Sequence, residues 1–183
     1  MPLVNCAECN EKVYFGLFKC KACRKSLCPS CGQKHYGHDD SADATLNQEE
    51  FQSLVRFMKI APGRLTAVIV PGPLVGQKVI EQIEAELQLP ITIASETAYP
   101  GEIGHLALEM QEKDSILIIR LDGSRKFPGE WTLKNFIENL NFQREALAGG
   151  NLRTCIIMND EANNLLLYHS DDLMDWCRIY RLT

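Results

Sequence analysis

The sequence predicts two parts: a small cross-braced module at the N-terminus, followed by a three-layer α/β domain with a mainly parallel five-stranded sheet. Eight cysteine and histidine residues, arranged as four pairs within the first 38 positions, indicate the first part. Five short apolar segments, separated by segments of helical periodicity, indicate the second. The chain of 183 residues is long enough for a small module and one domain that buries its own core.

Each of the four pairs has two residues between its members, in the spacing C-x2-C-x10-C-x2-C-x4-C-x2-C-x3-H-x2-H. The eight residues are Cys6, Cys9, Cys20, Cys23, Cys28, Cys31, His35 and His38. Zinc binds four thiolate or imidazole donors in a tetrahedron, and a two-residue gap lets a turn aim two donors at one ion. Eight donors complete two closed sites. We therefore expect two structural Zn²⁺ ions that stabilise the fold and perform no chemistry.

The pairs can share the two ions in two ways. In the sequential arrangement, the first two pairs bind one ion and the last two bind the other. In the interleaved arrangement, the first and third pairs form site 1, and the second and fourth pairs form site 2. We favour the interleaved arrangement because the gap from Cys23 to Cys28 is short, as in a cross-brace. Site 1 is then Cys6, Cys9, Cys28 and Cys31, and site 2 is Cys20, Cys23, His35 and His38.

The segment CKACRKSLCPSCGQKHYGH, residues 20–38, resembles a B-box-type zinc finger, a relative of RING fingers. The resemblance implies a cross-braced module with two zinc ions that mediates protein contacts or self-association. Many B-boxes have histidine at the second ligand, where this chain has Cys9. A RING finger places its first histidine in the middle of the array rather than at the end, so ubiquitin-ligase activity is not implied.

Charge is unevenly distributed along the chain. Residues 1–38 contain six Lys or Arg and two Glu, a charge of +4, and since the whole chain carries −5, residues 39–183 carry −9. Two zinc ions bound by six thiolates would reduce the first value to +2. This is weak for a nucleic-acid-binding arm, which needs a dense basic face.

Cysteine usage and hydropathy bear on the compartment. The chain has no apolar run of the roughly 18 residues that span a bilayer, and its first residues do not resemble a signal peptide. We expect a cytoplasmic protein, where thiol pairs are zinc ligands rather than disulfides. Cys155 and Cys177 lie in apolar segments and are expected to be small core residues.

A polar linker, residues 39–46, separates the two parts. Asn47 is expected to cap a helix, with two glutamates near its positive end. The apolar residues of this helix recur at helical spacing; they are Phe51, Leu54, Val55 and Met58. The helix ends before the Pro62-Gly63 turn. The expected domains are 1–38, the zinc finger; 39–60, linker and helix; and 61–183, the α/β domain.

Strands and helices alternate through the α/β domain. The expected strands are 65–70, 91–94, 116–121, 153–158 and 177–182. The expected helices are 78–87, 102–112, 132–148 and 161–169, with a short turn or helix at 171–176. Apolar strands that alternate with helices predict a parallel sheet covered on both faces.

The turn after the first strand resembles a damaged phosphate loop of the G-x4-G-K-[ST] type. Gly72 and Lys78 have the right separation, but Gln77 stands at the second glycine and Val79 at the hydroxyl residue. The second glycine lets backbone N–H groups close around phosphates, and the hydroxyl binds Mg²⁺. Asp122, after the third strand, could serve as the metal-side aspartate. Gly72, Lys78 and Asp122 are thus candidate residues for binding ATP or GTP, and hydrolysis is not expected.

A second resemblance covers roughly residues 60–183. It is carried by LNFQREAL at 140–147, by the strand RTCIIMND at 153–160, and by Asp172-Leu173 with Trp176. These motifs resemble the NTPase domains of bacterial AAA+/STAND-type signalling proteins, in which an LN-x-x-R-(D/E)-x-L helix precedes an apolar strand and a D-L-x-x-W segment. The family implies a P-loop core with strand order 5-1-4-3-2 and nucleotide-driven assembly, often in defence against phage.

This chain departs from that family in two ways. Its phosphate loop is degenerate, and it ends after the fifth strand without a helical lid or sensor domain. Arg144 is expected to pair with a nearby carboxylate rather than to act in catalysis. The sequence therefore favours a non-enzymatic zinc-binding adaptor or scaffold that acts through protein–protein contacts, in bacterial defence or signalling. The alternatives are a nucleotide-binding switch with little or no hydrolysis, and a zinc-finger nucleic-acid binder.

Overall fold

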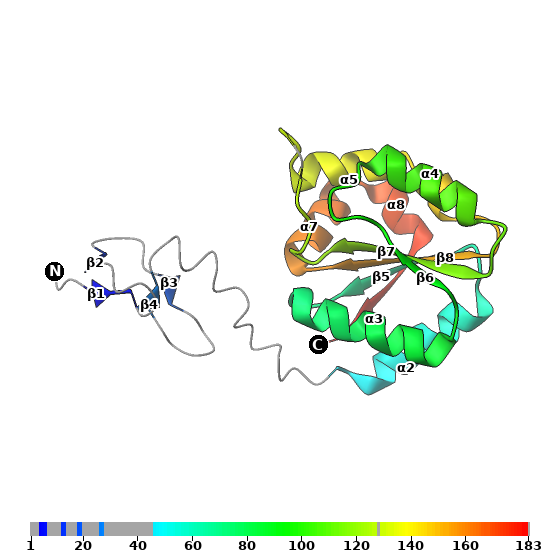
Figure 1. Ribbon diagram of the computed structural model, residues 1–183, viewed down its shortest axis with the longest axis horizontal. Helices are drawn as coiled ribbons and strands as arrows, with labels where there is room; N and C mark the ends of the chain where they lie inside the picture. Colours follow the sequence, from blue (N-terminus) through cyan, green and yellow to red (C-terminus); the bar gives the residue numbers. More distant parts are fainter. Residues whose placement is uncertain are drawn as a thin grey trace. The chain divides into compact units, whose positions relative to one another are not determined.

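The computed structural model describes residues 4–6, 12–13, 18–19, 26–27, 46–127 and 129–182 (Figure 1). The chain divides into two compact units. The first unit is Met1–Ala44 and the second unit is Thr45–Thr183. The boundary falls inside the expected linker, 39–46.

The first unit contains two short antiparallel strand pairs. In one, β1 (Val4–Asn5) pairs with β2 (Lys12–Val13); in the other, β3 (Phe18–Lys19) pairs with β4 (Ser26–Leu27). Cys6 follows β1 directly and is buried. The remaining predicted zinc ligands lie outside the described residues; they are Cys9, Cys20, Cys23, Cys28, Cys31, His35 and His38. The two zinc sites remain a prediction.

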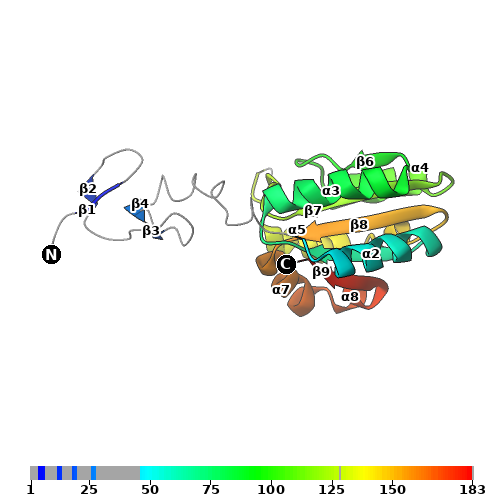
Figure 2. The ribbon, with the colours of Figure 1, turned by 90° about the horizontal axis from the view of Figure 1, so that it is seen from below.

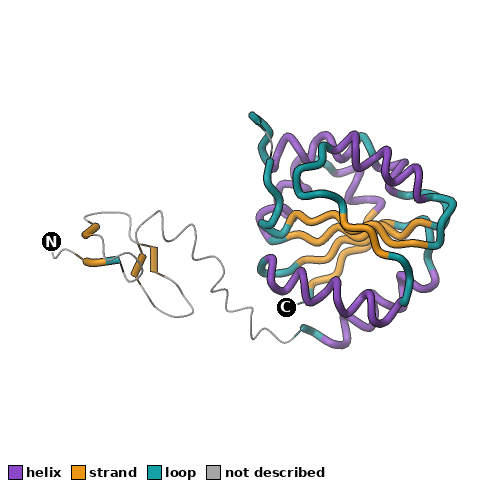
Figure 3. Tube along the Cα trace, in the orientation of Figure 1, coloured by secondary structure: helices purple, strands orange, loops and turns teal. Residues whose placement is uncertain are grey.

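The second unit is built on one five-stranded parallel sheet, drawn as the central orange layer of Figure 3. Its strands are β5 (Leu65–Ile69), β6 (Ile91–Ile93), β7 (Ser115–Leu121), β8 (Leu152–Met158) and β9 (Cys177–Arg181). Their order across the sheet is β6-β7-β8-β5-β9, and every neighbouring pair is parallel. Counted along this unit and read from the β9 edge, that is 5-1-4-3-2. The expected strand order is confirmed.

Helices cover both faces of the sheet and complete the three-layer fold (Figures 1 and 2). On one face lie α2 (Gln48–Ile60) and α3 (Pro73–Leu87). On the other lie α4 (Pro100–Met110), α5 (Leu133–Asn141), α6 (Arg144–Leu147), α7 (Asp160–His169) and α8 (Asp171–Trp176). Every residue of β5 and β8 is buried, which explains why these strands are mostly apolar rather than alternating. The buried polar residues in them are Thr66, Arg153 and Thr154.

The helix expected after Asn47 is confirmed as α2. The Asn47 side-chain oxygen accepts the backbone N–H of Glu50 at 3.1 Å and caps the helix. The buried residues of α2 are those that the periodicity predicted: Phe51, Leu54, Val55 and Met58. The helix packs against α3 and β9, and the backbone N–H of Asn47 donates to the Leu182 carbonyl. It therefore belongs to the second unit.

The expected start of the next helix is wrong. Helix α3 begins at Pro73, five residues before position 78, and only residues 70–72 separate it from β5. Proline suits the first helical position because it has no N–H to leave unpaired and its φ is already helical. The segment interpreted as a damaged phosphate loop is consequently helical from Pro73 onward.

The single helix expected over 132–148 is divided into α5 and α6, although no glycine or proline interrupts it. Contacts with α4 account for the break. Gln143 lies against Gly104, where an added Cβ would come within 2.0 Å of the Gln143 side-chain oxygen. Gln111 also donates to the Ala146 carbonyl at 3.0 Å. The partner of Arg144 is the Asn141 carbonyl, at 3.2 Å, rather than the expected carboxylate.

The remaining elements of the second unit start and end within two residues of the expected positions. Among the described residues, no helix is both long and apolar enough to cross a membrane.

Candidate functional site

The carboxyl ends of the parallel strands form the edge of the sheet at which ligands of such folds usually bind. The chain leaves β5 for α3 on one face, and leaves the neighbouring β8 for α7 on the other. The ends of β5 and β8 are therefore where a ligand is expected to bind. Gly72 follows β5 and Asp122 follows β7, so two of the three predicted nucleotide-binding residues come from this edge.

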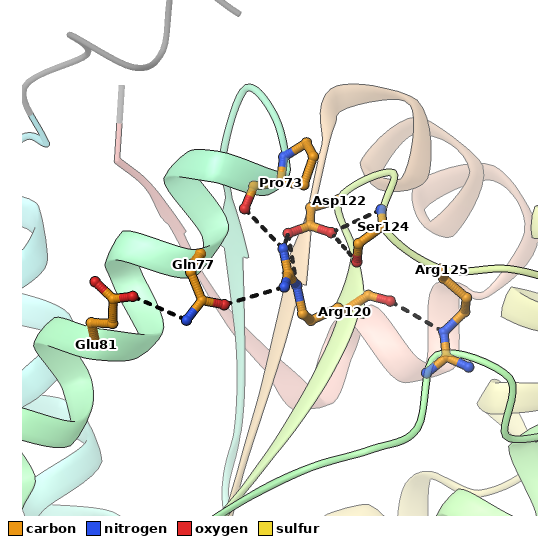
Figure 4. A network of polar contacts seen from close by, with 7 residues as sticks. All are labelled: Pro73, Gln77, Glu81, Arg120, Asp122, Ser124 and Arg125. Carbon is orange, nitrogen blue, oxygen red and sulfur yellow. Dashed lines mark hydrogen bonds and ion pairs between the residues drawn. The ribbon is translucent and has the colours of Figure 1, made fainter. Parts of the chain in front are cut away.

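Asp122 forms an ion pair with Arg120 at the end of β7 (Figure 4). The Asp122 Oδ2 atom accepts from Arg120 Nη2 at 2.8 Å and from Arg120 Nε at 3.1 Å. The Asp122 side chain is fully buried and that of Arg120 is 12% exposed. Residues two apart along a strand lie on the same face, which brings the two side chains together.

The second oxygen of Asp122 is also occupied. Oδ1 accepts from the Ser124 backbone N–H at 3.2 Å and from the Ser124 hydroxyl at 2.7 Å. An ionised carboxylate accepts about four hydrogen bonds, and all four come here from the chain itself. In this arrangement Asp122 has no oxygen lone pair left for a Mg²⁺ ion.

The first turns of helix α3, which contain most of the expected phosphate loop, pack over the ion pair. Arg120 Nη2 donates to the Pro73 carbonyl at 2.8 Å, and Arg120 Nη1 donates to the Gln77 side chain at 3.4 Å. Gln77 in turn donates to Glu81 at 3.1 Å. The Arg120 guanidinium thus links the first turns of α3 to the end of β7.

Gly76 allows this close approach. A Cβ built on Gly76 would lie only 2.2 Å from Asp122 Oδ2, a distance that real Cβ atoms essentially never show. The glycine is needed for packing between α3 and the buried carboxylate. It is the residue before Gln77, so it is not the phosphate-loop glycine that the motif requires.

Gly72 and Lys78 lie at different positions along helix α3. Gly72 is buried at the N-cap of α3 in an extended conformation, whereas Lys78 is exposed in the second turn. A rise of 1.5 Å per residue puts Lys78 roughly 7.5 Å along the axis from the first helical residue. The structure therefore brings Gly72 and Asp122 to one edge and places Lys78 along the outside of the helix. Their role in binding nucleotide remains a prediction.

A second buried arginine lies beside this network. Arg125 Nε donates to the Arg120 carbonyl at 3.2 Å, and Arg125 Nη1 donates to the Ala98 carbonyl at 2.9 Å. Its guanidinium lies 4.5 Å from the ring centre of Phe136. Burial lowers the pKa of Arg125 to about 10, opposed by Glu96, so the group is still a cation at neutral pH. It joins the loop after β7 to the loop after β6.

Sequence reasoning treated Asp122 as a candidate metal ligand and overlooked Arg120, its partner. The available signal was the Arg-x-Asp spacing at the end of an apolar strand, because alternate residues share a face. The contribution of Gly76 could not be foreseen, since it depends on how closely α3 packs against β7.

No group of three or more His, Cys, Asp or Glu side chains that could hold a metal ion is found within the part of the chain that the structure describes. The thiol and imidazole set at residues 6–38 has the donor chemistry that zinc prefers.

No protein-family model matches the chain, and no curated protein is similar to it in sequence. Among solved structures, the chain is similar to the DnaC helicase loader, with a TM-score of 0.47 and 12% sequence identity. The similarity covers 76% of this chain and 92% of that one. No activity is transferred from that protein to this chain.

Proposed function

We propose that this protein is a non-enzymatic adaptor with a zinc-stabilised N-terminal unit and a second unit derived from a P-loop-type domain whose nucleotide site has been filled by the chain's own side chains. Both units then act through contacts with other proteins. The AAA+/STAND resemblance suggests bacterial defence or signalling as the setting.

The Arg120–Asp122 pair is the observation that carries this proposal. A working P-loop domain leaves the aspartate after its third strand available to the metal ion and uses a flexible loop to enclose the phosphates. Here the aspartate is saturated by Arg120 and Ser124. The loop before the helix is reduced to residues 70–72.

Binding of Mg²⁺–ATP would require Arg120 to leave. Separation of a buried ion pair leaves an uncompensated charge and costs about 3–5 kcal/mol. Gln77 and the Pro73 carbonyl would each lose a hydrogen bond as well. Nucleotide binding would have to offset this cost in a site that lacks the second loop glycine and the hydroxyl ligand.

The short strands of the first unit support the interleaved zinc assignment. β1 and β4 lie close together, with Cα atoms of the two strands within 8 Å of each other. Cys6 directly follows β1 in the sequence and Cys28 directly follows β4. A contact between these strands favours sharing of one ion by the first and third cysteine pairs.

Isothermal titration of the full chain with Mg²⁺–ATP and Mg²⁺–GTP tests the proposal. We expect no saturable heat. Saturable binding that is abolished in Lys78→Ala would overturn it in favour of the nucleotide-binding switch. Metal analysis of the purified chain should find two zinc ions, and fewer would remove the zinc-stabilised unit from the proposal. Tight, steeply salt-dependent binding of DNA or RNA would instead favour the nucleic-acid binder.

A further inference from the structure

Strand β6 forms one free edge of the sheet, with α3 on one side of it and α4 on the other (Figures 1 and 2). It pairs only with β7: the Ala94 N–H donates to the Ile118 carbonyl, and the Ile116 N–H donates to the Pro90 carbonyl. In a parallel ladder only alternate residues bond to the same neighbour. The N–H and C=O groups of Ile91 and Ile93 therefore point outward, where no other described segment hydrogen-bonds to them.

The two edges of the sheet differ in how they are protected. At the opposite edge, β9 carries Arg178 and Arg181, and charged side chains of this kind discourage strand addition. Arg181 pairs with Asp160 at 2.7 Å. The sequence of β6 is Ile-Thr-Ile, with no charged residue, and the Ile93 side chain is 45% exposed. The β6 edge is thus the more receptive of the two.

The surroundings of β6 are strongly acidic. Residues 73–113 span α3, β6 and α4 and contain seven glutamates, two lysines and no aspartate or arginine, a charge of −5. Two cations of the loop after β7 lie beside Glu96: Arg125 Nη1 donates to the Glu96 carbonyl at 3.4 Å, and the backbone N–H of Lys126 donates to it at 3.2 Å. All seven glutamates are partly or fully exposed; they are Glu81, Glu84, Glu86, Glu96, Glu102, Glu109 and Glu112. A negative potential of this kind attracts basic segments and repels nucleic acid and anionic lipid.

A pocket of about 400 Å³ lies where the chain leaves β6 for α4. It is lined by Ala94, Ser95, Thr97, Tyr99, Glu102 and Leu106, among others. The walls combine apolar groups with the Ser95 and Thr97 hydroxyls and one carboxylate, that of Glu102, whose Oε2 also accepts the Tyr99 N–H at 2.7 Å. A long side chain that ends in a positive charge suits such walls, since its stem packs on the apolar groups and its end meets Glu102.

We propose that the β6 edge is a docking surface for an extended basic segment of a partner protein, which adds to the sheet as a sixth strand. Backbone groups of Ile91 and Ile93 supply the ladder hydrogen bonds, the surrounding glutamates select for lysine and arginine, and the pocket receives one side chain. This proposal rests on the proposed adaptor function and specifies one surface and one class of partner for it.

The test uses the full chain and fluorescein-labelled peptides with blocked termini. One short peptide alternates lysine and valine, and its matched control alternates glutamate and valine. We expect the basic peptide alone to bind, by fluorescence anisotropy, and to bind more weakly as ionic strength rises. Equal binding of the two peptides, or no binding of the basic one, would overturn the proposal.

Two proline variants locate the binding site. Ile93→Pro removes an outward-pointing N–H from β6, and Ile179→Pro removes one from β9. The Leu182 N–H of the β9 side donates inward to the Ile69 carbonyl, so by the same alternation the N–H of Ile179 points outward. Both side chains are similarly exposed, 45% and 43%. We expect about a tenfold or greater loss of peptide affinity in Ile93→Pro and less than about a twofold change in Ile179→Pro. Equal effects in the two variants would place binding elsewhere.

Circular dichroism and thermal melting establish that each variant is folded. If Ile93→Pro does not fold, Ile93→Lys puts a positive charge on the same edge and should weaken the basic peptide by a similar factor; unchanged binding in Ile93→Lys would overturn the proposal. The nucleotide titration is a separate measurement. ATP binding would refute the adaptor function, whereas failure of the peptide test alone would refute only this edge as its docking surface.

Discussion

Arg120 and Asp122 form a buried ion pair at the carboxyl end of β7, with 2.8 Å between Nη2 and Oδ2. Asp122 is the residue that the sequence marked as a candidate metal ligand. The consequence of the pair is that the charges of this edge are satisfied within the chain.

Removal of one member of the pair should be costly. We expect Asp122→Ala or Arg120→Met to lower the free energy of unfolding by about 3–5 kcal/mol, because the other charge is left buried without its partner. Denaturant titration followed by circular dichroism measures the change. The matched control is Asp160→Ala, which breaks a pair at 2.7 Å whose members are 51% and 67% exposed. It should cost less than about 1 kcal/mol.

Combining Arg120→Met with Asp122→Ala provides a sharper measurement. Since both charges are then absent, the double variant should be more stable than the sum of the single changes predicts. Additive effects would show that the two side chains do not interact in solution.

Gly76→Ala should destabilise the second unit by about 1–3 kcal/mol, because the new methyl group would overlap Asp122 Oδ2. Gly101→Ala is the matched control, since Gly101 also lies in a helix but has no atom within 4 Å of an added Cβ. That change should raise stability by up to about 1 kcal/mol, as alanine favours the helix. Comparable losses in both variants would refute the packing argument.

The two cysteines of the sheet should be unreactive in the folded protein. Burial raises the pKa of Cys155 to about 12 and that of Cys177 to about 12, so the nucleophilic thiolate is scarce at neutral pH. With zinc removed, a thiol reagent should modify six of the eight cysteines in native buffer and the last two only in denaturant. Rapid modification of all eight would contradict the buried position of Cys155 and the partly buried position of Cys177.

The raised pKa of Cys155 makes the free energy of unfolding depend on pH. A thiol with a raised pKa in the folded state is neutral there while its unfolded counterpart ionises from about pH 9. The stability this contributes is fully present below about pH 9 and is lost as the pH rises toward 12. Cys155→Ala should therefore show a shallower loss of stability in this range than the unaltered chain, by denaturant titration at several pH values.

Zinc chelation should affect the two units differently. Metal binding stabilises only the unit that contains the metal ligands, because its free energy contributes to the folding of that unit. We expect a strong chelator to abolish the structure of residues 1–44 and to leave the thermal transition of residues 45–183 unchanged. Hydrogen exchange measured by mass spectrometry resolves the two units in the full chain. Protection lost throughout the second unit would show that the units fold as one.

Periodicity predicted most helices and strands of the second unit because the buried residues of each element recur at the spacing of that element. The apolar runs at β5, β7 and β8 are buried on both faces, and the spacing from Phe51 to Met58 defines one face of α2. Local motifs were less informative where a neighbouring element determined the outcome. The break between α5 and α6 depends on contacts with α4, which is distant in the sequence. The start of α3 at Pro73 is a local proline signal that the phosphate-loop interpretation overlooked.

The sequence by itself determined the alternation of strands and helices, the cap at Asn47, the set of eight candidate zinc ligands and, through a family resemblance, the order of the strands. Only the tertiary structure decided that Arg120 neutralises Asp122 under Gly76, and that β6 rather than β9 is the unprotected edge. The reason is physical. Periodicity and capping act over a few neighbouring residues, whereas the environment of a charge and the exposure of an edge depend on which distant segments pack beside them.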